Sequence, residues 1–292
     1  MKKNPVSDCW YADPESRVYG DRVYFYVTNS LPFDEQKNLD LLVTSDLETY
    51  AIRRSILDAE TFRGLERAVW APSAVEKDGR YYLIFAAGDI HSEEELGGLY
   101  LGVSDRPEGP FRSAREDGLP FLNRIYGGAQ PIDPHFFKDG DGTVYLYYGG
   151  WGHLMVGVMR DDFTGLRPLP GADFGGVFRE ITPADYVEAP CVLKLGEKYH
   201  LTYSTGNWTD GTYRVLAAEA ESPLGPFVPY GTILEASPLA DGPGHNSAFF
   251  WKGKWYAAYH RRTVGDLYPH NRRLSVDLLP VEGGKLGRVI MT

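Results

Sequence analysis

The sequence predicts an all-β fold, a five-bladed β-propeller, and three observations support this prediction. Five segments share one plan: a short apolar strand, a polar turn of Asp, Gly or Lys, and an aromatic-rich strand, as in a β-hairpin. The segments recur at a regular interval, and no long amphipathic helical window separates them. Such a period is typical of propeller blades, which are four-stranded sheets around a central channel. The segments are residues 11–28, 70–87, 132–150, 188–206 and 245–262.

A proline or a serine near the start of each segment marks the register of the repeat. Taken in order, the marks are Pro14, Pro72, Pro134, Pro190 and Ser247, which stand 56 to 62 residues apart. Five units of this length account for the whole chain, so we expect one propeller domain over residues 1–292, without a linker or an appended module. A non-repeating β-sandwich or barrel is the alternative, because short strands alone do not distinguish these folds.

Two further apolar runs supply additional strands in the second and fourth units. Residues 98–105 precede the turn SDRPEGPF, and residues 213–220 precede the similar turn ESPLGPF. In both turns proline and glycine end one strand and a phenylalanine begins the next, as turns between adjacent strands require. The strands of the repeat therefore extend beyond the five hairpins.

The charge and the N-terminal sequence exclude several classes of partner. A net charge of −10 argues against nucleic acid, because phosphate binding needs a basic face. The N-terminus MKKNPVSDCW has no apolar run after its lysines, so we expect no membrane partner and a cytoplasmic location. The only basic cluster is 261–273, which is either a solvated loop or the source of an arginine at the channel mouth; we favour the second reading. The oligomeric state is left open.

Three acidic residues, Asp13, Asp133 and Glu188, stand at matching points of units one, three and four. The first strand of each blade lines the channel, so these points converge at one end of it. The same point carries Ala71 in unit two and Asn246 in unit five, so the repeat itself does not require an acid there. Three carboxylates in one pocket cannot all ionise cheaply, and one stays protonated. A protonated and an ionised carboxyl are what hydrolysis of a glycosidic bond needs.

Each acid taken alone also has a structural explanation. An Asp-Pro pair is usually a turn or a strand start whose carboxylate caps nearby N–H groups. Glu188 before Ala-Pro could be a half-buried acid with one hydrogen bond. Their common register favours the catalytic explanation.

The motifs ADP at 12–14, WAP at 70–72, EAP at 188–190 and the arginine segment near 272 give the chain a close resemblance to a known family. The chain resembles glycoside hydrolase family 43, five-bladed propeller enzymes that cleave arabinose- and xylose-containing saccharides. The resemblance implies that Asp13 is the general base that activates water and that Glu188 is the general acid. It implies that Asp133 orients its catalytic partner and tunes the pKa of that partner.

The same resemblance implies further contacts with the sugar. Trp70 is expected to help wall the pocket for the terminal sugar. Arg272, five residues before Asp277, is expected to bind substrate, with Arg261 and Arg262 as competitors for that role.

His245 resembles the histidine that lies near the propeller axis in this family, often beside a bound cation and water. We therefore expect either a structural histidine or one that contacts a cation through water. No cofactor is required for the reaction; a structural Ca²⁺ or another cation near the axis is the only candidate. The segment DGDG at 139–142 is interpreted as a hairpin turn, because the sequence has no compact carboxylate loop of the EF-hand type.

The resemblance implies hydrolysis with inversion, in which Asp13 and Glu188 face each other across about 6.5–9.5 Å to leave room for water. We expect exo action on a terminal pentose of a short oligosaccharide, with α-L-arabinofuranose preferred and β-xylose as the alternative, alone or in a bifunctional enzyme. The loops 29–40, 88–97 and 206–212 are expected to set the depth of the pocket. An endo-arabinanase, a glycoside phosphorylase and a sugar-binding propeller without turnover are the weaker alternatives.

Overall fold

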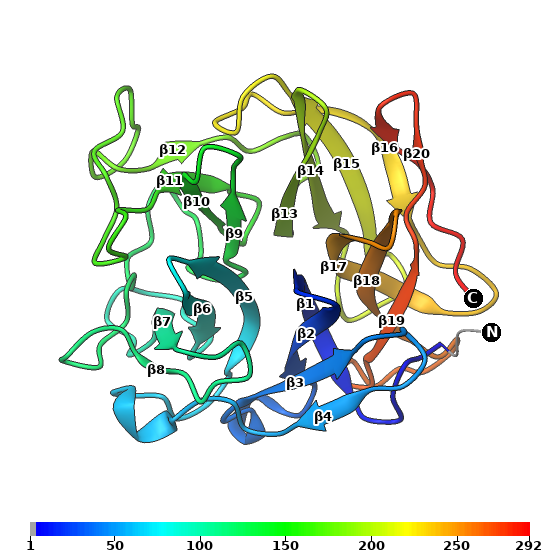
Figure 1. Ribbon diagram of the computed structural model, residues 1–292, viewed down its shortest axis with the longest axis horizontal. Coiled ribbons are helices and arrows are strands. Elements are labelled where there is room, and N and C mark those ends of the chain that lie inside the picture. The colour runs from blue at the N-terminus through cyan, green and yellow to red at the C-terminus, as the bar shows by residue number, and fades with distance from the viewer. Residues whose placement is uncertain (1–3) are drawn as a thin grey trace.

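The computed structural model describes residues 4–292, so Met1, Lys2 and Lys3, part of the N-terminal sequence used to predict location, lie outside the described residues. Five antiparallel sheets stand around a central channel (Figure 1), which confirms the predicted five-bladed β-propeller. In every sheet the strands follow chain order from the channel outward. This arrangement gives each blade one inner strand, and the inner strands are β1, β5, β9, β13 and β17.

The strands of the five blades have the following bounds. Blade one contains β1 (Tyr11–Tyr19), β2 (Arg22–Asn29), β3 (Leu39–Thr44) and β4 (Ala51–Arg53). Blade two contains β5 (Trp70–Lys77), β6 (Arg80–Ala87), β7 (Gly98–Ser104) and β8 (Arg112–Ser113). Blade three contains β9 (His135–Lys138), β10 (Val144–Tyr148), β11 (Met155–Val158) and β12 (Arg179–Glu180). Blade four contains β13 (Glu188–Leu195), β14 (Lys198–Thr205), β15 (Arg214–Ala220) and β16 (Val228–Leu234). Blade five contains β17 (Asp241–Trp251), β18 (Lys254–Arg262) and β19 (Arg273–Leu278).

Short elements complete the chain. They are the 3₁₀ turns η1 (Phe33–Glu35) and η2 (Ala59–Thr61) and a C-terminal hairpin of β20 (Val281–Glu282) and β21 (Lys285–Leu286). The predicted strands at 98–105 and 213–220 are β7 and β15, and DGDG forms the turn between β9 and β10. Within residues 4–292, no helix has the length and apolar character needed to cross a membrane.

The start of the described chain lies along the outer edge of blade five. The Val6 N–H donates to the carbonyl of Leu274 in β19 at 2.9 Å, and the Asn4 side chain donates to the carbonyl of Val276 at 3.1 Å. Asn4 also donates to the hydroxyl of Thr292 at 3.0 Å, so the two ends of the chain meet at this blade (Figure 1). These contacts tie the first and last parts of the ring together.

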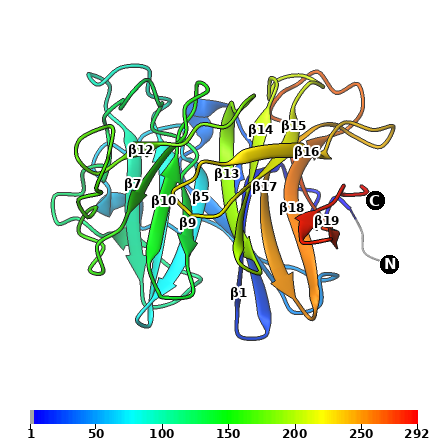
Figure 2. The ribbon, with the colours of Figure 1, turned by 90° about the horizontal axis from the view of Figure 1, so that it is seen from above.

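The hydrophobic core lies between neighbouring blades. One cluster joins Ile84 of blade two to Phe136 and Leu146 of blade three, and all three side chains are fully buried. Aromatic rings belong to the same cluster, in which Tyr82 and Phe163 stack with centroids 3.8 Å apart. Because each blade packs on its neighbours, the fold holds the inner strands firmly at the channel (Figure 2).

Candidate active site

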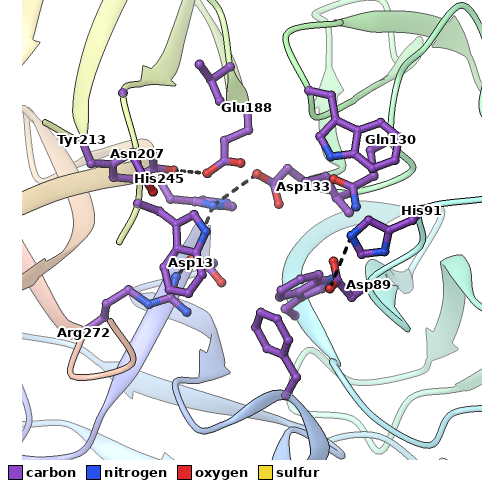
Figure 3. A pocket seen from close by; sticks show the side chains of 17 residues that line it. Asp13, Asp89, His91, Gln130, Asp133, Glu188, Asn207, Tyr213, His245 and Arg272 are labelled. Carbon is purple, nitrogen blue, oxygen red and sulfur yellow. Dashed lines mark hydrogen bonds and ion pairs between the residues drawn. The ribbon is translucent and has the colours of Figure 1, made fainter. Parts of the chain in front are cut away.

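A pocket of about 380 Å³ opens at the end of the channel where the inner strands begin (Figure 3). Side chains from all five blades surround it, and its volume is in the range of small-molecule sites. The three loops expected to set its depth all contribute, through Phe33, Asp89, His91, Asn207 and Trp208. The structure also brings every predicted site residue into the lining: Asp13, Trp70, Asp133, Glu188, His245 and Arg272.

One residue near the start of each inner strand adopts the left-handed backbone region. These residues are Asp13 (φ 49°), Ala71 (φ 49°), Asp133 (φ 51°), Ala189 (φ 58°) and His245 (φ 44°). In four of the blades the pairing with the second strand shifts at this residue, which marks a β-bulge. The left-handed region costs a non-glycine residue about 1–2 kcal/mol. Its recurrence in every blade shows that it belongs to the repeat.

The bulges show that the predicted register was wrong in two units. Glu188 precedes the bulge residue Ala189, so it corresponds to Trp70 and not to Asp13. In blade five the bulge residue is His245, not Asn246. In blade five the alignment could not detect the shift, because strand pairing places Asn246 where the other blades carry proline. In blade four Pro190 itself aligns Ala189 with Asp13. Asp13, Asp133 and His245 therefore share one backbone position, which explains why their side chains meet in the pocket.

Asp13 is buried and faces a permanent positive charge. Its Oδ1 lies 3.1 Å from Nη1 of Arg272, 3.4 Å from Nδ1 of His245 and 3.2 Å from Nδ1 of His260. Burial alone would raise the pKa of Asp13, but the Arg272 charge, with smaller contributions from the two histidines, holds this pKa well below its usual range. Burial also lowers the pKa of His260 to about 4, so that ring is uncharged at neutral pH. Arg272 is therefore the partner that keeps Asp13 ionised.

Asp133 and Glu188 have the opposite electrostatic setting. Burial raises the pKa of both carboxyls, and the charges of Glu188 and Asp13 raise that of Asp133 further. At Glu188 the rise is opposed by the hydroxyl of Tyr213, which donates to Oε1 at 2.7 Å. Oδ2 of Asp133 accepts the N–H of Ala189 at 3.0 Å. The pair therefore retains a proton at pH values where exposed carboxyls have lost theirs.

This combination can do acid–base chemistry on a bound molecule. An ionised carboxylate at Asp13 can accept a proton from water, and the protonated pair Asp133 and Glu188 can donate one to a leaving oxygen. The catalytic roles assigned to these three residues remain predictions, and so does the distance between Asp13 and Glu188.

An aromatic wall stands beside Asp13 and Arg272. Trp70 and Phe33 meet edge to face with centroids 4.9 Å apart, and Trp208 lies 6.4 Å from Phe33. The guanidinium carbon of Arg272 lies 5.0 Å from the ring centre of Trp208. Sugar C–H faces pack on such walls. Sequence reasoning found Trp70 through WAP but not Phe33 or Trp208, which come from loops outside the repeat.

The opposite rim carries polar groups that sequence reasoning also missed. Asp89 and His91 lie between β6 and β7, with Nε2 of His91 3.9 Å from Oδ2 of Asp89 (Figure 3). Gln130 lies beside them and donates to the carbonyl of Ile90 at 2.9 Å. Trp151 covers this side, with its ring 5.8 Å from that of His91. The sequence predicted that loop 88–97 shapes the pocket, but no motif in it singled out Asp89 or His91.

Arg272 is the arginine that the structure places in the pocket, whereas its predicted competitors lie outside the lining. Arg262 donates to the carbonyl of Thr209 at 2.7 Å. Arg261 lies near the hydroxyl of Tyr259, and neither residue lines the pocket. The neighbouring residues in sequence are thus held by other partners.

The side chains around the axis do not fit a calcium site made of protein oxygens. Below the pocket the buried carboxylate of Glu15 pairs with the guanidinium of Arg17 and accepts the hydroxyl of Ser73 at 2.9 Å. Arg17 donates in turn to the carbonyls of Ala74 and Phe136, at 2.6 and 2.5 Å, in blades two and three. Calcium needs six to eight oxygen ligands, and Arg17 already supplies the positive charge.

His245 offers no ligand cluster either. Its Nδ1 is directed at two carboxylates of the pocket, Asp13 at 3.4 Å and Asp133 at 3.6 Å. Among residues 4–292, no group of three or more His, Cys, Asp or Glu side chains is arranged to hold a metal ion. The amide of Asn246 is buried without a partner in the same part of the chain, and a water molecule would satisfy it. A cation bound to His245 through water remains a prediction.

Comparison with known proteins places the chain among glycosidases. The model of the family described as "Glycosyl hydrolases family 43" matches residues 2–284. A β-D-galactofuranosidase of Aspergillus niger, xynD, is 34% identical over 94% of this chain and 80% of its own length. A β-xylosidase of Xylanibacter ruminicola is 33% identical over 86% of this chain and 87% of its own length. The crystal structure of a thermostable family-43 glycoside hydrolase has the same fold, with a TM-score of 0.83 at 24% identity over 100% of this chain and 96% of that one.

Proposed function

The chain belongs to family 43 of the glycosyl hydrolases and is a glycoside hydrolase, and we propose that it removes a terminal pentose from short oligosaccharides by inversion. The observation that carries the proposal is a pocket surrounded by all five blades, with Asp13, Asp133 and Glu188 converging in it. A surrounded pocket accepts the end of a chain, whereas an endo enzyme needs a groove that is open at both sides. This argument supports exo action over endo-arabinanase activity.

In the proposed reaction the base and the acid come from different blades. Asp13, kept ionised by Arg272, takes a proton from the water that attacks the anomeric carbon. Glu188 gives its proton to the glycosidic oxygen as the bond to the leaving group breaks. Asp133 and Glu188 oppose each other's ionisation, so the pair keeps a proton until the reaction needs it.

We propose α-L-arabinofuranose as the first substrate and β-xylose as the alternative. The aromatic wall of Phe33, Trp70 and Trp208 supports a compact sugar ring beside the base. Asp89 and His91 on the other rim supply groups for sugar hydroxyls. The relative from Xylanibacter ruminicola supports the xylosidase alternative.

The similarity to the galactofuranosidase of Aspergillus niger favours a second candidate, a terminal β-D-galactofuranose. Its ring carbons have the configuration of α-L-arabinofuranose, and it adds one hydroxylated carbon outside the ring. A pocket that holds one sugar can therefore hold the other if its rim has room and a polar partner. Asp89 and His91 line the pocket and are the polar residues that we propose as partners of the additional hydroxyl.

A panel of p-nitrophenyl glycosides tests these proposals. The α-L-arabinofuranoside, β-D-xylopyranoside and β-D-galactofuranoside are compared for wild type and for Asp13→Asn, which keeps the size of the side chain but removes the base. We expect hydrolysis of the arabinofuranoside by wild type and a loss of at least about 100-fold in the variant. Absence of turnover on all three would contradict the proposal. Release of a sugar phosphate only when phosphate is added would indicate a phosphorylase.

A further inference from the structure

Tyr213 lies just before β15 with its ring buried and its hydroxyl directed at Glu188 (Figure 3). The hydroxyl donates to Oε1 of Glu188 at 2.7 Å, and within residues 4–292 no other side chain forms a hydrogen bond with that carboxyl. The orientation of the carboxyl therefore depends on Tyr213.

The backbone of blade five is shaped to admit this ring. Gly244 is the residue before the bulge residue His245, so it occupies the position of Trp70 and Glu188 in other blades. A Cβ atom at Gly244 would overlap Cε1 and Cδ1 of the Tyr213 ring. The side chain is thus missing in blade five at the place where Tyr213 needs the space.

Ser204 of β14 lies beside the Tyr213 hydroxyl. It accepts the backbone N–H of His245 at 2.9 Å, and it faces Glu188 in the ladder between β13 and β14. Ser204 thus links the bulge of blade five to the strand pair that carries Glu188.

The ring also connects the acid side of the pocket to the base side. Its plane lies within 3° of the plane of His260, with centroids 5.8 Å apart. Nδ1 of His260 lies 3.2 Å from both the amide nitrogen and Oδ1 of Asp13. Tyr213 and His260 thus form a continuous layer behind Asp13 and Glu188.

We infer that Tyr213 is a positioning residue that holds the Glu188 carboxyl toward the leaving oxygen and that Gly244 leaves the space that the Tyr213 ring requires. The inference rests on the proposed role of Glu188 as general acid. A rotating carboxyl would protonate a leaving group less often, and the loss would be largest where the leaving group most needs the proton.

The hydrogen bond from Tyr213 stabilises the ionised carboxyl, so its removal raises the pKa of Glu188. Four other titratable or charged groups face this carboxyl. They are Asp13 of blade one, Asp133 of blade three, Arg272 of blade five and Tyr186 of the segment before β13.

The test compares Tyr213→Phe with wild type on two α-L-arabinofuranosides, one with a p-nitrophenyl leaving group and one with a methyl leaving group. We expect kcat/KM to fall about 10- to 100-fold for the methyl glycoside, the effect of one hydrogen bond to a charged group, and much less for the p-nitrophenyl glycoside. The basic limb of the pH profile should move to higher pH. Tyr147→Phe is the matched control, because it removes a buried hydroxyl that donates to the Pro223 carbonyl at 2.7 Å, away from the pocket.

Gly244→Ala provides a second route, since the added methyl displaces the ring while keeping the hydroxyl, and the same dependence on leaving group is expected. Equal losses on both glycosides with an unmoved basic limb would overturn the inference and leave Tyr213 a packing residue. A wrong assignment of Glu188 as the general acid is recognised separately. In that case Glu188→Gln would hydrolyse the methyl glycoside at the rate of the wild type. Carboxyl ¹³C NMR titration of Glu188 in wild type and Tyr213→Phe tests the interaction without turnover, and an unchanged pKa would also overturn it.

Discussion

Replacing Arg272 by methionine tests the electrostatic basis of the site most directly. Arg272 and Asp13 are both buried, and the charged atoms are 3.1 Å apart. At an effective dielectric constant of about 20, two unit charges at that distance interact by about 5 kcal/mol. At about 1.4 kcal/mol per pKa unit this would be nearly four units. Water entering the space left by the guanidinium reduces the effect, so we expect the pKa of Asp13 to rise by about 1–3 units, as for other Asp–Arg pairs.

The assay is the pH profile of kcat/KM, whose acid limb reports the base in the free enzyme. We expect the wild type to lose activity only below the usual pKa of aspartate, because Arg272 holds the pKa of Asp13 low. In Arg272→Met the acid limb of the kcat/KM profile should move to higher pH values, at which the protein is folded. Circular dichroism at each pH checks the folding.

Arg272→Lys is the control, because lysine keeps the positive charge but has a shorter side chain to contact the substrate. Both variants are expected to raise KM, but only the methionine variant should shift the acid limb fully. An acid limb in Arg272→Met that coincides with that of the wild type would refute the assignment of Arg272 as the group that keeps Asp13 ionised.

Two further predictions concern stability. Because the folded-state pKa values of Asp133 and Glu188 lie above their unfolded values, the folded state holds extra protons, so the free energy of unfolding should fall as pH rises above about 4 toward those raised values. Urea unfolding at pH 5 and pH 8 should therefore show a smaller fall for Asp133→Asn than for wild type, and an equal fall would contradict the raised pKa of Asp133. Chelation with EDTA should leave the melting temperature unchanged, because Arg17 neutralises Glu15 at the axis, whereas Arg17→Met should lower the free energy of unfolding by about 3–5 kcal/mol. A melting temperature that drops with EDTA and recovers with Ca²⁺ would overturn this second prediction.

The fold could be predicted from the sequence because local sequence patterns define each unit of the repeat. Strand, turn and aromatic strand recur in all five units, and the β5–β6 and β13–β14 hairpins lie where 70–87 and 188–206 placed them. The outer edge strands of the blades were less predictable. β8 and β12 are only two residues long, and their ends depend on pairing with the neighbouring strands rather than on local sequence.

The candidate site was predictable only where the residues belong to the repeat or to a family motif. Asp13, Asp133, Trp70 and Glu188 stand near the starts of inner strands, and all of them line the pocket. Tyr213 carries no such mark, because its position depends on the space left by a glycine 31 residues later in the chain. Contacts of this kind arise from packing between neighbouring blades and cannot be recognised from spacing.

The two aspartates show why geometry had to decide the chemistry. Asp13 and Asp133 have the same backbone conformation at the same position of two blades, and both are buried. Their pKa values nevertheless shift in opposite directions, because Arg272 approaches Asp13 at 3.1 Å while Asp133 faces the charges of Glu188 and Asp13. The repeat therefore supplies equivalent anchor points for side chains, and it does not determine their protonation. The loop before β19 breaks the equivalence by delivering one arginine to one side of the pocket, and this asymmetry separates an ionised base from a proton-holding pair on a nearly symmetrical fold.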